Sequence, residues 1–77
     1  MSTEDLKEKL REIVCEVAEI DEVPDDTPFK DLGIDSMMAI EIIADVERNY
    51  GIKVPEEELE QISDLNSVVT LVNSKLS

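Results

Sequence analysis

The chain contains no histidine and no tryptophan, and Cys15 is its single cysteine. Without histidine, neither a Ser-His-Asp nor a Cys-His nucleophile pair can form, and histidine-containing zinc sites are excluded. A single cysteine excludes an internal disulfide framework and is typical of a reducing compartment, so the expected location is the cytoplasm. We therefore expect no catalytic residue, no metal site and no enzyme activity in the chain itself.

Positive charge is also scarce, because 7 lysine and arginine residues stand against 20 aspartate and glutamate residues, for a net charge of -13. A nucleic-acid binder needs cations to replace the counterions on phosphate, so this class is excluded, and an anionic membrane surface would repel the chain in the same way. Long hydrophobic runs are missing too: residues 1–10 mix charged and apolar positions. We therefore expect no signal peptide and no insertion into a membrane.

Hydrophobic residues nevertheless make up 42% of the 77 positions, and they fall at helical spacing in three segments. These segments are residues 3–18, residues 36–50 and the stretch that follows Asp64, which is its expected N-cap. A shorter helix is predicted from Pro55, because proline suits the first turn and the glutamates after it complement the helix dipole. In the first segment, Cys15 lies about 180° from the centre of the apolar stripe, so we expect it to face solvent.

Residues 21–35, between the first two helices, are predicted to form a long loop. Pro24 and Pro28 disfavour helix at the residue before each of them, and Gly33 marks a turn. One domain is expected over residues 1–77, because single domains begin at about 50 residues and a second would lack the chain to build a core. The predicted fold is all-α, a small four-helix bundle of three longer helices and one short helix with a long first loop.

The second predicted helix has apolar residues on two opposite faces. The expected core stripe comprises Ala39, Ile42, Ile43, Val46 and Tyr50. The opposite face carries Met37, Ile40 and Ala44, interleaved with Glu41, Glu47 and Arg48. Two interpretations are open for this second face. Either neighbouring elements wrap around the helix, or the face docks a partner, with methionine giving adaptable apolar contact and the carboxylates giving register.

One segment, Asp31-Leu32-Gly33-Ile34-Asp35-Ser36-Met37, brings a serine to the first turn of this helix. A serine in that position is most often only an N-cap, and Asp35 offers a second capping oxygen. The start of a helix also favours negative charge, because unpaired backbone N–H groups and the helix dipole point there. A phosphate attached to Ser36 would therefore be stabilised, and both roles of Ser36 are physically sensible.

This segment resembles the acyl carrier protein family, whose motif is Gly-x-Asp-Ser-Leu. Gly33-Ile34-Asp35-Ser36-Met37 matches it at every position but the last, and the resemblance extends nearly end to end through Phe29, Asp31-Leu32, Glu41, Tyr50 before Gly51, and Ile52-x-Val54-Pro55. The resemblance implies that a phosphopantetheinyl transferase attaches 4′-phosphopantetheine from coenzyme A to Ser36, with Asp35 supporting the modification. It implies a free-standing carrier of acyl thioesters, not an enzyme, because the catalytic groups belong to its partners.

The resemblance also implies the other partners, which are acyl-transferring and condensing enzymes with basic docking patches that attract an acidic, monomeric carrier. Their docking surface would comprise Met37, Ile40, Glu41, Ala44, Asp45, Glu47 and Arg48. Met38 and Arg48 stand where fatty-acid carriers are commonly acidic, so both a fatty-acid pathway and a polyketide or other specialised lipid pathway are open. Two further alternatives are a peptidyl or aminoacyl carrier, for example of D-alanine, and an unmodified acidic helical interaction module.

Overall fold

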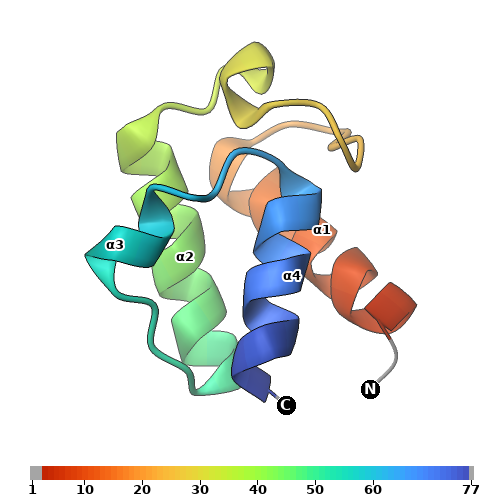
Figure 1. The fold of residues 1–77 in the computed structure, drawn as a ribbon. Coiled ribbons are helices and arrows are strands. Elements are labelled where there is room, and N and C mark those ends of the chain that lie inside the picture. The colour runs from red at the N-terminus through yellow and green to blue at the C-terminus, as the bar shows by residue number, and fades with distance from the viewer. Residues whose placement is uncertain (1–2, 77) are drawn as a thin grey trace.

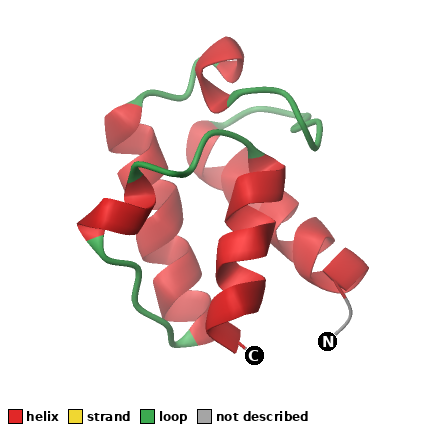
Figure 2. Ribbon diagram, viewed as in Figure 1, coloured by secondary structure: helices red, strands yellow, loops and turns green. Residues whose placement is uncertain are grey.

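Four α-helices and one 3₁₀ helix make up the fold in a computed structural model that describes residues 3–76 (Figure 1). They are α1 (Thr3–Ala18), the 3₁₀ helix η1 (Phe29–Leu32), α2 (Ser36–Tyr50), α3 (Glu56–Leu59) and α4 (Leu65–Leu76). All regular structure in residues 3–76 is helical (Figure 2), so the predicted fold class is confirmed. The predicted domain, residues 1–77, includes three terminal positions outside the described residues.

The core lies where α1 packs against both α2 and α4. Its side chains are aliphatic apart from Phe29, and no polar side chain of residues 3–76 is buried. The apolar stripes predicted for the three longer helices face this core. The prediction that Cys15 faces solvent was wrong, because Cys15 is half-buried against the core, and this burial raises the pKa of its thiol. No helix within the described part is long and apolar enough to cross a bilayer.

The predicted long loop between α1 and α2 is not irregular throughout, because it contains η1. Phe29, only 5% exposed, anchors this short helix in the core. The Phe29 N–H donates to the Ser63 carbonyl (2.8 Å), and the Phe29 carbonyl accepts the Ile34 N–H (3.0 Å). Gly33 then turns the chain with φ +80°, a left-handed conformation that strains any residue with a Cβ. These contacts fix the path of the backbone that leads into α2.

The ends of the other helices follow local capping chemistry. Asp64 caps α4, as predicted: its Oδ1 accepts the Ser67 N–H (2.9 Å), while the Ser67 hydroxyl accepts the Asp64 N–H (3.0 Å). Gly51 ends α2 in the left-handed conformation (φ +64°), and its N–H donates to the Glu47 carbonyl (2.8 Å). Pro55 immediately precedes α3, so the predicted helix start is also confirmed.

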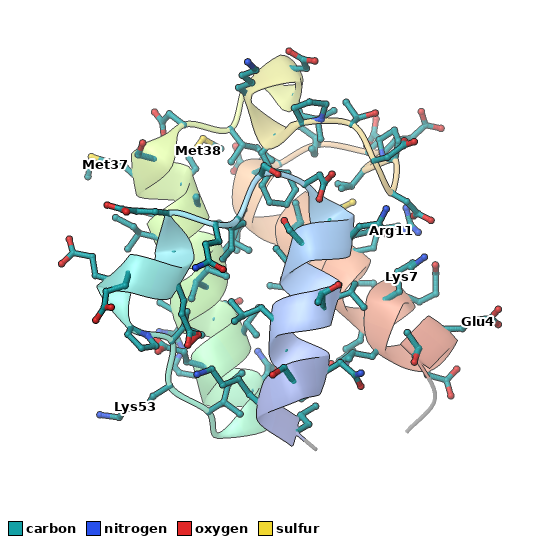
Figure 3. All side chains as sticks on the ribbon, viewed as in Figure 1. Glu4, Lys7, Arg11, Met37, Met38 and Lys53 are labelled. Carbon is teal, nitrogen blue, oxygen red and sulfur yellow. The ribbon has the colours of Figure 1, made fainter. Side chains whose placement is uncertain are left out.

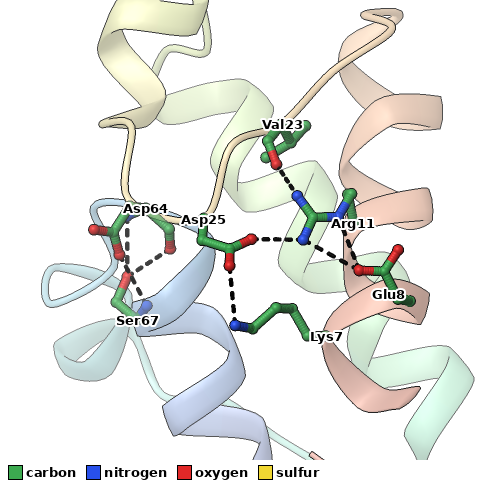
Figure 4. A network of polar contacts seen from close by, with 7 residues as sticks. All are labelled: Lys7, Glu8, Arg11, Val23, Asp25, Asp64 and Ser67. Carbon is green, nitrogen blue, oxygen red and sulfur yellow. Dashed lines mark hydrogen bonds and ion pairs between the residues drawn. The ribbon is translucent and has the colours of Figure 1, made fainter. Parts of the chain in front are cut away.

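A polar network ties the first part of the long loop to α1 and α4 (Figure 4). The Arg11 guanidinium donates to the Val23 carbonyl and pairs with Asp25 Oδ1 (2.5 Å), and Lys7 Nζ pairs with Asp25 Oδ2 (3.0 Å). The Asn66 N–H of α4 donates to the Asp25 carbonyl (3.1 Å). Hydrogen bonds from Arg11 and then Lys7 lower the pKa of the Asp25 carboxyl. We call Lys7, Arg11 and Asp25 the loop brace.

Candidate functional site

Ser36 is the first residue of α2, and Asp35 is the N-cap. Asp35 Oδ1 accepts the Met38 N–H (2.9 Å), and the Asp35 carbonyl accepts the Ala39 N–H (2.9 Å). Of the two capping residues expected from the sequence, Asp35 is therefore the N-cap and Ser36 is not. Ser36 is exposed, and within residues 3–76 its hydroxyl makes no hydrogen bond. The hydroxyl is free for chemistry.

The electrostatic surroundings of Ser36 combine a helix terminus with nearby carboxylates. The first backbone N–H groups of a helix lack intrahelical acceptors, and here Asp35 satisfies that of Met38. The remaining partial positive charge favours an anionic group attached at the first turn. Asp35 and Asp31 are themselves exposed and lie close to Ser36 in the sequence. A phosphate on Ser36 would therefore be held by the helix start and repelled by its acidic neighbours.

An open hollow of about 640 Å³ lies beside Ser36, between the start of α2, η1 and the region of α3. Its volume is within the range of about 300–1,000 Å³ that small-molecule sites occupy. The lining includes the apolar side chains of Ile34, Ala39, Ile40, Leu59 and Ile62, together with the charged side chains of Lys30, Asp35, Glu56 and Glu60. We call it the Ser36 hollow. No sequence pattern predicted this hollow, although the apolar pair Leu59 and Ile62 stands out in an otherwise acidic segment.

The second apolar face of α2 is uncovered. Met37 is 74% exposed and Ile40 is 54% exposed, and Figure 3 shows Met37 projecting away from the helix into solvent. Glu41 and Arg48 are exposed on the same helix, and Ala44 is half-buried. Neighbouring elements therefore leave Met37 and Ile40 uncovered, so the first of the two interpretations was wrong for these two side chains, whereas Ala44 is partly covered.

Two carboxylates of the predicted docking surface have partners within the chain. Asp45 forms an ion pair with Arg48, one turn further along α2. The Glu47 carboxylate accepts the Val54 N–H (2.8 Å) and so holds the segment that leads from α2 to α3. Met38 is half-buried against the core, so it adds little to the exposed apolar surface. Met37, Ile40 and Glu41 are thus the exposed side chains of the predicted surface that make no ion pair or hydrogen bond with other residues of 3–76, whereas the exposed Arg48 pairs with Asp45.

Residues 8–72 match the protein family described as "Phosphopantetheine attachment site". The chain belongs to this family. The match spans α2 with both Asp35 and Ser36, as well as η1 and α3, so it includes every element around the Ser36 hollow. The cofactor predicted from the resemblance is confirmed at the level of the family.

Individual relatives of this carrier agree with the family. The chain is 45% identical over 73 residues to polyketide-8 synthase acyl carrier protein 2 of Streptomyces avermitilis, with 91% of this chain and 84% of the relative covered. It is also 45% identical over 73 residues to an anthracycline acyl carrier protein of a Streptomyces species, with 88% and 87% covered. The crystal structure of an acyl carrier protein from Thermotoga maritima superimposes with a TM-score of 0.85 at 27% identity, covering 99% of this chain and 92% of the other.

The chain is therefore a phosphopantetheine-dependent acyl carrier of fatty-acid or polyketide biosynthesis, and a non-catalytic one. Its family implies a phosphopantetheinyl transferase and biosynthetic enzymes as partners. The prediction of an acyl carrier is confirmed. The matches favour it over both alternatives raised from the sequence, the aminoacyl carrier and the unmodified interaction module.

Proposed function

We propose that Ser36 is the residue that receives 4′-phosphopantetheine and that Asp35 supports the modification. The observation that carries this proposal is the division of roles at the start of α2. Because Asp35 caps the helix, the exposed Ser36 hydroxyl has no structural task. The arm could pack in the Ser36 hollow against the apolar side chains of Ile40, Leu59 and Ile62. The residues present therefore fit the group.

In the proposed attachment, Ser36 Oγ forms a new bond to the phosphorus next to the pantetheine of coenzyme A. The bond between the two phosphates of coenzyme A breaks, and the other phosphate leaves with the nucleotide. The serine proton passes to a base of the transferase, since the chain has no histidine of its own. The arm then supplies a terminal thiol, which carries the acyl group as a thioester. Asp35 keeps the first turn of α2 in place while a partner encloses it.

We propose further that the load is a polyketide intermediate. Support comes from the 45% identity to two Streptomyces carriers whose names place them in polyketide and anthracycline assembly. The chain-specific support is the docking surface, where Met37 and Ile40 are exposed and Arg48 pairs with Asp45. An enzyme that fits this surface needs an apolar pocket for Met37 and Ile40, bordered by basic residues that face Glu41 and the other carboxylates.

Condensing and acyl-transferring enzymes are the partners we assign to this surface, with the carrier acting as a cytoplasmic monomer. A net charge of -13 speeds the encounter of the carrier with basic patches. Salt screens this attraction, so the carrier is also released easily, which suits a protein that must visit several enzymes. Two exposed apolar side chains are far fewer than the roughly 20–30 residues that each partner contributes to a stable protein interface. The surface therefore suits transient docking better than a permanent dimer.

The attachment test uses intact mass. Incubating the unmodified chain with coenzyme A and a broad-specificity phosphopantetheinyl transferase should add one phosphopantetheinyl group, and Ser36→Ala should add none. Ser63→Ala is the matched control, because Ser63 is another exposed serine that lines the Ser36 hollow. It should be modified like the wild type. Modification of Ser36→Ala, or a wild type that gains no mass, would refute the proposal.

The docking test compares two exposed aliphatic residues. Ile40→Ser should slow transfer from the loaded carrier to a polyketide condensing enzyme by about 5- to 30-fold, as for loss of a central interface residue. Leu76→Ser removes a similarly exposed aliphatic side chain (45%) at the end of α4 and should leave transfer unchanged. Equal rates for the two variants would exclude this surface, and faster transfer to a fatty-acid condensing enzyme would exclude the polyketide load.

A further inference from the structure

Lys30 is the one cation among the described residues that line the Ser36 hollow. Three carboxylates, Asp35, Glu56 and Glu60, line the same space. The other charged side chains of the hollow therefore repel any anion placed there. Only Lys30 and the start of α2 can offset a new negative charge.

Lys30 also has no ion pair among residues 3–76, although the chain has 20 carboxylates. Four other basic residues are each paired with a carboxylate: Lys7, Arg11, Arg48 and Lys75. Lys9 and Lys53 also form no ion pair within the described part of the chain, but neither lines the hollow. Lys30 thus combines an ammonium group that has no ion pair among residues 3–76 with a place in the hollow that Ser36 also lines.

The backbone of Lys30 is held in position. Lys30 lies in η1, next to the buried Phe29, and its carbonyl accepts the Gly33 N–H (3.3 Å). The Phe29 N–H donates in turn to the carbonyl of Ser63, another residue that lines the hollow. The backbone of Lys30 is therefore fixed, while its flexible four-carbon side chain lets the compact ammonium charge move.

We propose that Lys30 is the counter-ion of the phosphodiester that attachment creates at Ser36, and this proposal rests on the attachment proposed above. The phosphodiester adds a full negative charge next to Asp35, on a serine that shares the hollow with Lys30. A lysine binds such a phosphate as a point charge, without needing the planar fork of arginine. Lys30 is a positioning residue here. It draws the base of the arm toward η1, so that the arm leaves Ser36 across the hollow.

The test measures how fast an amine-acetylating reagent modifies each lysine before and after attachment, read by mass spectrometry of peptides. Pairing should slow acetylation of Lys30 by about 1.5- to 5-fold in the modified chain, the range expected for an exposed ion pair. Lys53 is the internal control, because it is also exposed and lies near the C-terminal end of α2, a helix about 22 Å long that begins at Ser36 (Figure 3). Its rate should not change. The protection of Lys30 should shrink in about 0.5 M salt, because screening weakens an ion pair and leaves steric cover intact.

Charge reversal gives a second readout on the modified chain. Lys30→Glu should shift the phosphorus resonance of the arm and make the arm more mobile by NMR relaxation, Lys30→Arg should restore both, and Lys53→Glu should change neither. Equal behaviour of the Lys30 and Lys53 variants, or equal acetylation rates at Lys30 before and after attachment, would overturn the role of Lys30 and leave the attachment at Ser36 standing. A chain that never gains the arm overturns both proposals.

Discussion

The side of the molecule around α1 and the side around Ser36 are held together by different means. Around α1, fully buried aliphatic side chains and the loop brace tie three separate segments to one another. Around Ser36, α3 buries no residue of its own, and Met37 and Ile40 are open to solvent. Glu58 of α3 is tied to Lys75 of α4 by one ion pair (2.7 Å). Buried side chains and ion pairs that stabilise the fold are thus concentrated around α1. The exposed Ser36 hydroxyl and the exposed apolar side chains lie on the Ser36 side.

This contrast matches what a carrier must do. Under the proposed attachment, Ser36 and its arm have to enter several active sites, so the surface around Ser36 must remain accessible and adaptable. The free-energy cost of that exposed surface is offset elsewhere, because the buried residues of α2, which are Ile42, Ile43 and Val46, are all distinct from the docking residues. Substitutions should therefore separate cleanly into those that reduce stability and those that reduce function.

The largest expected difference is between a core leucine and an exposed isoleucine. Leu10→Ala removes a fully buried side chain (0% exposed) from α1, and we expect a loss of about 2–5 kcal/mol in the free energy of unfolding. Ile40→Ala, on the other side, should change it by less than about 0.5 kcal/mol. Urea unfolding followed by circular dichroism measures both. Comparable losses would mean that the Ser36 side contributes to the core after all.

Asp35 has both a structural and a proposed functional role, because it caps α2 and is next to Ser36. Asp35→Ala removes the cap and should cost about 0.5–2 kcal/mol, while Asp35→Asn keeps a capping oxygen and should cost little. If Asp35 also supports the modification through its charge, both variants should be modified more slowly by the transferase. Thermal unfolding and initial rates of mass gain separate the two roles. If Asp35→Asn is modified at the wild-type rate, Asp35 only caps the helix and its charge does not support the modification.

Much of the scaffold could be predicted because its signals are local. Apolar spacing indicated the three longer helices, Pro55 and Asp64 marked two helix starts, and the Gly33-to-Met37 motif pointed to the serine. Each of these features depends on residues within one or two turns of one another. The same reasoning identified the second apolar face of α2, which depends only on the period of the helix.

The features that could not be predicted depend on contacts between segments that are far apart in the sequence. Arg11 and Asp25 are 14 positions apart and pair only because the chain reverses after α1. The Glu47 carboxylate was assigned to docking, yet it holds the Val54 N–H across a turn whose geometry no spacing rule describes. The Ser36 hollow likewise needs α2, η1 and the α3 region together. Cys15 became half-buried although the helical wheel placed it outside, because a wheel represents one helix without its neighbours.

Acid should weaken the α1 side specifically. Because its partners lower the pKa of Asp25 in the folded state, this carboxylate contributes stability above its unfolded pKa of about 3.9 and loses it as the pH falls through the folded pKa. Asp25→Asn should therefore melt below the wild type at pH 7, and the difference should close as the pH falls below about 4. Asp26→Asn, an exposed neighbour, makes the same change in charge and is the control. A difference in melting temperature that stays constant with pH would show that the Asp25 carboxylate is not the source of the effect.

The smallest effect is expected at the tie between α3 and α4. Lys75→Met leaves the half-buried Glu58 carboxylate without its cation, and Glu58 Oε2 already has no hydrogen-bond partner among the described residues. Amide exchange of α3 should accelerate by up to about 5-fold, because an ion pair of this exposure contributes at most about 1 kcal/mol, while exchange in α1 should not change. Adding Glu58→Gln should recover part of the loss, since a neutral amide is less costly than an unpaired carboxylate in a half-buried position. Lys53→Met is the control for the lost charge. Faster exchange in α1 as well would mean that α3 and the core open together, and the two sides of the molecule would then be one cooperative unit.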